Sequence, residues 1–161
     1  MRIVLVHPAG SNWVPGKKDV SATANRMAPL GLLSIAAYLE KKGHRVMVED
    51  CLGPFAAASK KETVRRILRH DPEFVGFSTT TSGFLDAYEL TGMIMDVRPE
   101  IRSVFGGVHV SAMGGELLER FPLIDYLCLG EGEGTLSELA DGKPVSSIDG
   151  LVWRRDGGVE T

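Results

Sequence analysis

The chain contains five short apolar runs, which are separated by stretches whose apolar residues recur at helical spacing. The runs cover residues 2–6, 45–49, 74–77, 102–105 and 126–129. Most are apolar at successive positions, which is typical of strands that are buried on both faces. Strands and helices that alternate in this way predict a three-layer α/β domain, Rossmann-like or flavodoxin-like, in which right-handed crossovers join parallel strands.

Local signals place the ends of several elements. Pro29 suits the first turn of a helix, and the segments 59–62 and 135–138 both read as capping boxes. After Gly142 the pattern changes to a strand that runs into an Asp-Gly hairpin turn. We therefore expect a domain over residues 1–142, followed by a linker and a truncated hairpin over residues 143–161.

Composition narrows the class of protein. The net charge of -3 and the lack of a basic cluster argue against nucleic acid as a partner. No apolar run is long enough to span a membrane, and the N-terminus reads as a strand rather than a secretion signal. Cys51 and Cys128 fit no metal or redox spacing, so the sequence predicts a reduced, cytoplasmic protein.

Polar or small residues follow each apolar run. In open parallel sheets, ligands bind outside the carboxyl ends of the strands, where the strand order reverses. The segment 78–82 offers five hydroxyl groups, and Gly106-Gly107 exposes bare backbone that a ligand can approach closely. Any single hydroxyl could serve as a helix cap or turn former, but five in a row at a strand end favour contact with a large polar ligand.

Other familiar sites are missing. The segment 130–134 has the wrong glycine spacing for a dinucleotide loop, and its two glutamates would repel a pyrophosphate. No two of the four histidines have the spacing of metal ligands, and no serine or cysteine lies in a nucleophile elbow. The residues by themselves favour a binding module over a self-sufficient enzyme.

Four blocks, in order, resemble a known family. They are residues 29–39, 75–81, 105–112 and 125–133. Together they resemble the N-terminal cobalamin-binding domain of radical S-adenosylmethionine enzymes, which include anaerobic magnesium-protoporphyrin ester cyclases and related methyltransferases. The resemblance implies a five-stranded parallel sheet of order 2-1-3-4-5, with cobalamin at its carboxyl edge.

The resemblance also implies which residues contact cobalamin. The nucleotide tail would run past the hydroxyl run and over the two glycines, and the loop after the first strand would lie near the corrin ring. The expected contacts are His7, Pro8, Gly10, Ser78, Thr79, Thr80, Thr81, Ser82, Gly106, Gly107, Val108, His109, Gly130 and Glu131.

Two departures from related sequences bear on chemistry. Domains that ligate cobalt through histidine carry Asp-x-His-x-x-Gly, but here Leu5 precedes His7-x-x-Gly10. Without a carboxylate to orient it, His7 makes a weak ligand, so we expect no cobalt ligand from the protein and keep His7 as the alternative. The cysteine triad that holds an iron–sulfur cluster is also missing, so the chain alone cannot perform a radical step.

The expected parent protein is a cobalamin-dependent radical enzyme of the methyltransferase or oxidative-cyclase type. S-adenosylmethionine and the [4Fe-4S] cluster would bind only in a downstream barrel, which would be this domain's partner. An uncovered docking face could make the isolated domain self-associate. The alternatives are a ligand-free sensory or protein-interaction domain of the same fold and, ranked last, a flavodoxin-like enzyme.

Overall fold

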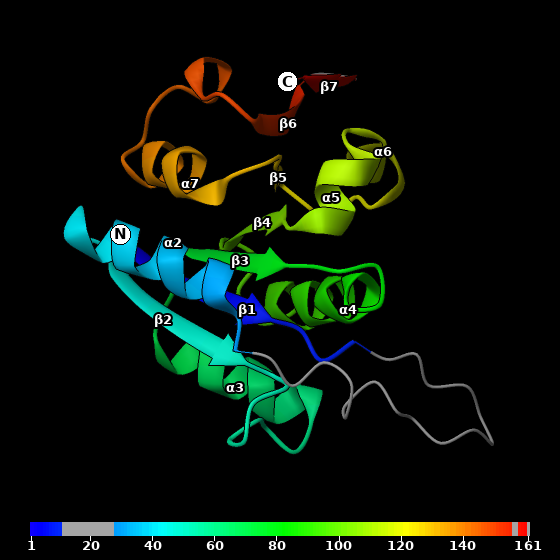
Figure 1. The fold of residues 1–161 in the computed structure, drawn as a ribbon. Helices are drawn as coiled ribbons and strands as arrows, with labels where there is room; N and C mark the ends of the chain where they lie inside the picture. Colours follow the sequence, from blue (N-terminus) through cyan, green and yellow to red (C-terminus); the bar gives the residue numbers. More distant parts are fainter. Residues whose placement is uncertain (11–27, 156–157, 161) are drawn as a thin grey trace.

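The computed structural model describes residues 1–10, 28–155 and 158–160 (Figure 1). Helices and strands alternate through most of the chain, as the sequence predicts. In order, they are β1 (Arg2–His7), α2 (Leu30–Lys41), β2 (Arg45–Asp50), α3 (Lys60–Arg69), β3 (Phe74–Ser78), α4 (Phe84–Met95), β4 (Arg102–Gly106), α5 (Val108–Met113), α6 (Glu116–Arg120), β5 (Tyr126–Cys128), α7 (Gly132–Ala140), the 3-10 turn η1 (Val145–Ser147), β6 (Leu151–Arg155) and β7 (Gly158–Glu160).

The strands form one mixed sheet of order β2-β1-β3-β4-β5-β6-β7. The first five strands are parallel, which confirms the predicted order 2-1-3-4-5. The predicted total of five strands is wrong, because β6 pairs antiparallel with β5 and β7 pairs antiparallel with β6. Leu151, Val152 and Trp153 are all buried, so β6 is covered on both faces and extends the sheet.

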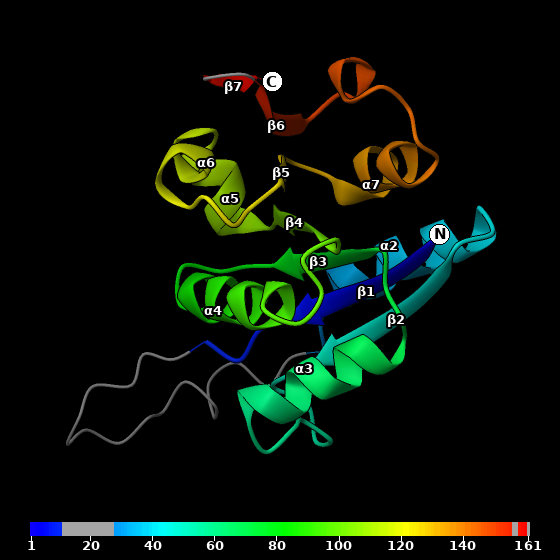
Figure 2. The ribbon, with the colours of Figure 1, turned by 180° about the vertical axis from the view of Figure 1, so that it is seen from behind.

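Helices cover both faces of the sheet, which confirms the predicted three layers. In Figure 1, α2 and α7 lie to the left of the sheet, and α4, α5 and α6 lie to its right; Figure 2 shows the same arrangement from behind. Alternate residues of β1 supply the two cores. Ile3 and Leu5 pack with α2 and α7, whereas Val4 and Val6 pack in the larger core with α3 and α4.

The two predicted capping boxes have different outcomes. Ser59 caps α3, and its hydroxyl accepts the Glu62 N–H at 3.3 Å. The prediction at Thr135 is wrong, because α7 already begins at Gly132. Thr135 is buried inside that helix, where its hydroxyl donates to the Asp149 carbonyl at 2.8 Å and ties α7 to the segment before β6.

Among the described residues, no helix combines the length and apolar character needed to cross a bilayer.

Candidate binding site at the carboxyl edge of the sheet

Four residues from adjacent strands stand in one row at the carboxyl edge. His7 of β1 pairs in register with Asp50 of β2. Val6 pairs with Phe77, so the next residues, His7 and Ser78, are level; Ser78 in turn pairs with Gly106 of β4. The strand order reverses between β1 and β3, so the crevice between His7 and Ser78 is the topological switch point.

A cavity of about 440 Å³ opens beside this row, between the sheet and the helices α2 and α7. We call it the helix-lined cavity. Most of its lining is aliphatic or glycine, and the polar groups are few. The lining residues are Leu5, Gly31, Leu32, Ile35, Gly76, Phe77, Ser78, Val104, Gly106, Gly107, Val108, Ser111, Cys128, Gly130, Glu131, Gly132, Glu133 and Leu136.

A second, smaller cavity of about 190 Å³ lies at the switch point itself, and we call it the switch-point cavity. Its walls come from the ends of β1 and β3, the start of α2 and the loop after β2. The lining residues are His7, Pro8, Ala9, Gly10, Ala28, Pro29, Leu52, Ser78, Thr80 and Ser82. Ser78 lines both cavities, so the two adjoin along the row of strand ends.

Glycine is required where β4 meets α5. Gly107 has a φ of 95°, and a Cβ built there would lie 2.7 Å from both the nitrogen and the carbonyl oxygen of Thr79. The Thr79 N–H and hydroxyl both donate to the Gly106 carbonyl, at 2.8 and 3.1 Å. The ends of β3 and β4 are therefore joined through their backbones. Gly106 and Gly107, which have no side chains, form part of the wall of the helix-lined cavity.

The structure brings most of the predicted contacts together at these cavities. Those along the helix-lined cavity are Ser78, Gly106, Gly107, Val108, Gly130 and Glu131. Those along the switch-point cavity are His7, Pro8, Gly10, Ser78, Thr80 and Ser82.

Three predicted contacts line neither cavity. Thr79 is buried, and its hydroxyl is taken by the Gly106 carbonyl. Thr81 is exposed and hydrogen-bonds Nδ1 of His109 at 3.2 Å. The His109 ring packs on Phe84, with 4.8 Å between ring centroids. These residues hold the loops after β3 and β4 in place beside the site.

Sequence reasoning missed the contribution of the helices. Gly31 and Ile35 of α2 both line the helix-lined cavity, and residues four apart share a helix face. Opposite them, Gly132 of α7 packs so closely that a Cβ there would meet Ile35 Cδ1 at 2.7 Å. The spacing of residues 31 and 35 was the available signal, but nothing local indicated that α7 would stand against α2.

Asp50 was expected at a strand end of the site, but not as the partner of His7. Its Oδ1 lies 3.0 Å from Nδ1 of His7 and accepts the Leu52 N–H at 3.0 Å. Two positions before His7, where related motifs carry an aspartate, the chain has Leu5. The carboxylate comes instead from the neighbouring strand, 43 positions along the chain, and only the register of β1 with β2 reveals it.

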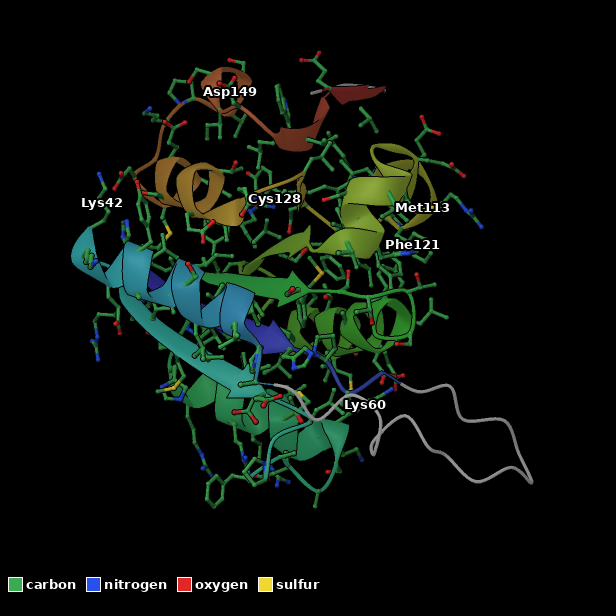
Figure 3. All side chains as sticks on the ribbon, viewed as in Figure 1. Lys42, Lys60, Met113, Phe121, Cys128 and Asp149 are labelled. Carbon is green, nitrogen blue, oxygen red and sulfur yellow. The ribbon has the colours of Figure 1, made fainter. Side chains whose placement is uncertain are left out.

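Two polar side chains of the helix-lined cavity, Glu133 and Ser111, have hydrogen-bond partners in the protein. Ser34 donates to Glu133 at 2.7 Å and so links α2 to α7, while Ser111 accepts the Gly130 N–H at 3.1 Å. Cys128 lies beside α7 (Figure 3), and burial raises the pKa of its thiol to about 11. The thiol is therefore neutral at physiological pH, and it adds no charge to an apolar wall.

Comparison with curated proteins finds relatives that are much longer than this chain. The anaerobic magnesium-protoporphyrin IX monomethyl ester cyclase of Synechocystis is 31% identical over 97% of the chain, which spans 31% of that protein. An uncharacterized methyltransferase of Pyrococcus horikoshii is 31% identical over 99% of the chain, which spans 34% of it. Cytidylyl-2-hydroxyethylphosphonate methyltransferase of Streptomyces wedmorensis is 31% identical over 82% of the chain, which spans 28% of it.

The fold and a family model agree with these relatives. A cobalamin-binding protein from Desulfitobacterium hafniense superimposes with a TM-score of 0.60 at 16% identity, over 88% of this chain and 57% of that one. The model of the B12 binding domain matches residues 16–140, which is most of the chain. The chain therefore belongs to the B12-binding domain family, whose cofactor is cobalamin.

Proposed function

We propose that this chain is the cobalamin-binding module of a radical S-adenosylmethionine enzyme, of the methyltransferase or oxidative-cyclase type. The observation that carries the proposal is the helix-lined cavity at the carboxyl edge of the sheet. The relatives include cyclases and methyltransferases, and this chain spans about a third of their length. Catalysis would then reside in the remainder of the parent protein.

The helix-lined cavity suits the nucleotide tail of cobalamin in size and chemistry. A cavity of about 440 Å³ is within the usual range for small-molecule sites, and its aliphatic walls suit the planar, uncharged base of the nucleotide tail. Gly106 and Gly107 contribute backbone without side chains to one wall. At Gly31, a Cβ would meet nothing within 4 Å, so the cavity keeps free space beside α2.

The chain's own residues would bind and orient the cofactor. Aliphatic side chains of α2, α7 and the sheet would exclude water from the tail. Ser78, Thr80 and Ser82 of the switch-point cavity would offer hydrogen bonds to its polar groups. When bound, cobalamin supplies a cobalt centre that carries a methyl group or exchanges electrons, while the protein supplies position and shielding.

Retention of hydroxocobalamin by the purified chain tests the proposal. We expect equilibrium dialysis to show saturable binding, weakened because the domain that would cover the ring is not part of the chain. Replacing Gly31 by Phe should fill the helix-lined cavity and reduce the affinity at least tenfold, without loss of helix content.

Gly134→Phe is the matched control. Gly134 is also a helical glycine whose Cβ would meet nothing within 4 Å, but it lines neither cavity. It should bind like the unmodified chain. Failure of the unmodified chain to bind at millimolar cobalamin would favour a ligand-free interaction domain of the same fold.

A further inference from the structure

A third cavity opens at the opposite edge of the sheet, where β1 and β2 begin and α3 ends, on the face that α3 covers (Figure 2). It has a volume of about 440 Å³, and we call it the amino-edge cavity. Cationic and polar groups dominate its walls, unlike those of the helix-lined cavity. The lining residues are Arg2, Ile3, Arg45, Val46, Met47, Arg69, His70 and Asp71.

The fold brings together three arginines that come from separate segments of the chain. Arg2 and Arg45 pair in register on the neighbouring strands β1 and β2, so their side chains leave the sheet on the same face. Val4 leaves β1 on that face too, and it packs in the same core as Ile67 of α3. The helix α3 ends at Arg69, which lines the cavity with the other two arginines. The sequence itself shows no basic cluster, because only the fold assembles one.

Arg2 is held in place by its neighbours. Its guanidinium pairs with the Asp71 carboxylate at 3.2 Å, and its Nε donates to the Asp71 carbonyl at 2.5 Å. Its backbone N–H donates to the Glu73 carboxylate at 2.8 Å, and that carboxylate also lies 3.7 Å from the guanidinium. These contacts fix Arg2 in the wall of the cavity and offset its charge.

Arg45 and Arg69 have no such partners. Both residues are exposed, and within the described part of the chain no carboxylate pairs with either guanidinium. Asp71, the one carboxylate that lines the cavity, is shared between Arg2 and Arg98. Like charges opposite each other on neighbouring strands, as at Arg2 and Arg45, are unfavourable. Two uncommitted cations thus face one cavity, and an anion bound between them would relieve the repulsion.

The donors and the walls select the class of ligand. Guanidinium groups present forked N–H donors that match the oxygens of a phosphoryl group two at a time. The volume is within the usual range for small-molecule sites, and Ile3, Val46 and the exposed Met47 offer apolar contact to an organic group. Nucleic acid requires a longer row of cations along a surface, which two free arginines do not supply.

We propose that the amino-edge cavity binds a phosphorylated small organic molecule, whose phosphoryl group is held by Arg45 and Arg69 beside the fixed Arg2. The site lies at the edge of the sheet opposite to the proposed cobalamin site. No residue that lines the amino-edge cavity also lines the helix-lined or the switch-point cavity. The proposal therefore goes beyond the proposed function and does not depend on it.

Nuclear magnetic resonance titration of the 15N-labelled chain with phenyl phosphate tests the site. At constant ionic strength we expect saturable shifts that are largest at the amide signals of residues 45, 69 and 70. Inorganic phosphate should bind at least about threefold more weakly, because it lacks a group that contacts the apolar wall. Equal affinities would assign the cavity to free phosphate and overturn the proposal, as would the absence of saturable shifts with either probe at millimolar concentration.

Two variants identify the residues that hold the phosphoryl group. Arg45→Gln and Arg69→Gln should each weaken the binding of phenyl phosphate at least about tenfold, since each removes a hydrogen-bonded charge. Arg120→Gln is the matched control, because it removes the same charge from an exposed arginine of α6 that pairs with Glu116 and lines none of the three cavities. It should bind like the unmodified chain. Equal weakening in all three variants would show that phosphate responds only to net charge and would overturn the proposal.

The same titration separates this site from the proposed cobalamin site. Shifts that gather at Gly106 and Gly107 would place the phosphoryl group at the carboxyl edge and would overturn the proposal. Arg45→Gln and Arg69→Gln should keep the dispersed amide spectrum of a folded chain and should bind hydroxocobalamin like the unmodified chain. If the unmodified chain binds phenyl phosphate at the amino edge but no cobalamin, the amino-edge site stands and the proposed function fails.

Discussion

Gly107 crosses the backbone of Thr79 so closely that no side chain fits between them. A Cβ at Gly107 would lie 2.7 Å from both the amide nitrogen and the carbonyl oxygen of Thr79, and φ at Gly107 is 95°. Backbone in this region is accessible almost only to glycine. The crossing joins the loops after β3 and β4, and both loops border the proposed cobalamin site.

The neighbouring glycines should therefore respond differently to the same substitution. Gly107→Ala should destabilise the fold by more than about 2 kcal/mol, because strain and a backbone clash act together. Gly106→Ala should cost less than about 1 kcal/mol, since its Cβ would lie 3.4 Å from the Cys128 carbonyl at an ordinary φ. Urea unfolding of both variants measures the difference, and equal losses would contradict this account of the crossing.

The helix-lined cavity predicts a preference for corrinoids that carry a tail base. Burial of an aromatic base against aliphatic walls removes on the order of 100 Å² of apolar surface from water, which contributes about 2.5 kcal/mol. Cobinamide, which lacks the base, should therefore bind at least about tenfold more weakly than cobalamin. Competition dialysis compares the two, and equal affinities would show that the tail does not enter the cavity.

The sequence was sufficient for the parallel part of the fold, because each strand and its helix have local signals. The runs at residues 2–6 and 74–77 are mostly apolar, and each is followed by polar or small residues that end a strand. The pairing of β6 with β5 was missed because residues 151–153 carry no signal of which strand they join. The available signal was three apolar residues in succession, a pattern typical of a strand that is buried on both faces, and the structure buries all three.

The site was only partly predictable for a related reason. Strand ends such as Ser78 and Gly106 follow directly from the rule on carboxyl edges. Asp50 joins the site through the register of β2 with β1, and Gly31 joins it through the packing of α2 on the sheet. Both depend on residues that are far away in the chain. Thr79 was expected to face the ligand, but alternation along the strand end turns it inward to the Gly106 carbonyl.

Two thiols, the buried Cys128 and the partly buried Cys51, predict that the stability of the chain falls at alkaline pH. Burial raises the pKa of Cys128 from 9.0 to about 11 and, with help from the nearby Glu49 carboxylate, that of Cys51 to about 12. The unfolded chain thus loses these protons at lower pH than the folded one. The contribution is complete below about pH 9 and is lost as the pH rises toward 11 and 12.

Urea unfolding at pH 8 and pH 10.5, compared between the chain and its Cys51→Ala, Cys128→Ala double variant, isolates the thiols from other groups. The double variant is less stable at pH 8 because it loses buried side-chain volume, but its stability should fall less between the two values. A parallel fall in both proteins would show that the thiols titrate alike in the folded and the unfolded chain, which would contradict the raised pKa values.

Substitutions in and before β6 test whether the β6–β7 pair belongs to the folding unit. Leu151 is 1% exposed and packs with Leu139, Ile148 and Trp153, so Leu151→Ala should destabilise the chain by about 3 kcal/mol. Lys143→Ala, which removes only a surface ion pair with Glu138, should change stability by less than about 0.5 kcal/mol. Both follow from denaturant unfolding under the same conditions.

Truncation after residue 142 also tests whether β6 and β7 belong to the folding unit, because it removes both strands. It removes Val152 and Trp153, which are 0% and 8% exposed, and leaves the edge of β5 and the inner face of α7 open to water. We expect the truncated chain to unfold at a much lower urea concentration than the full chain, or to aggregate through the uncovered edge. A truncated chain as stable as the full one would instead support a domain that ends at residue 142, with β6 and β7 as an attachment to it.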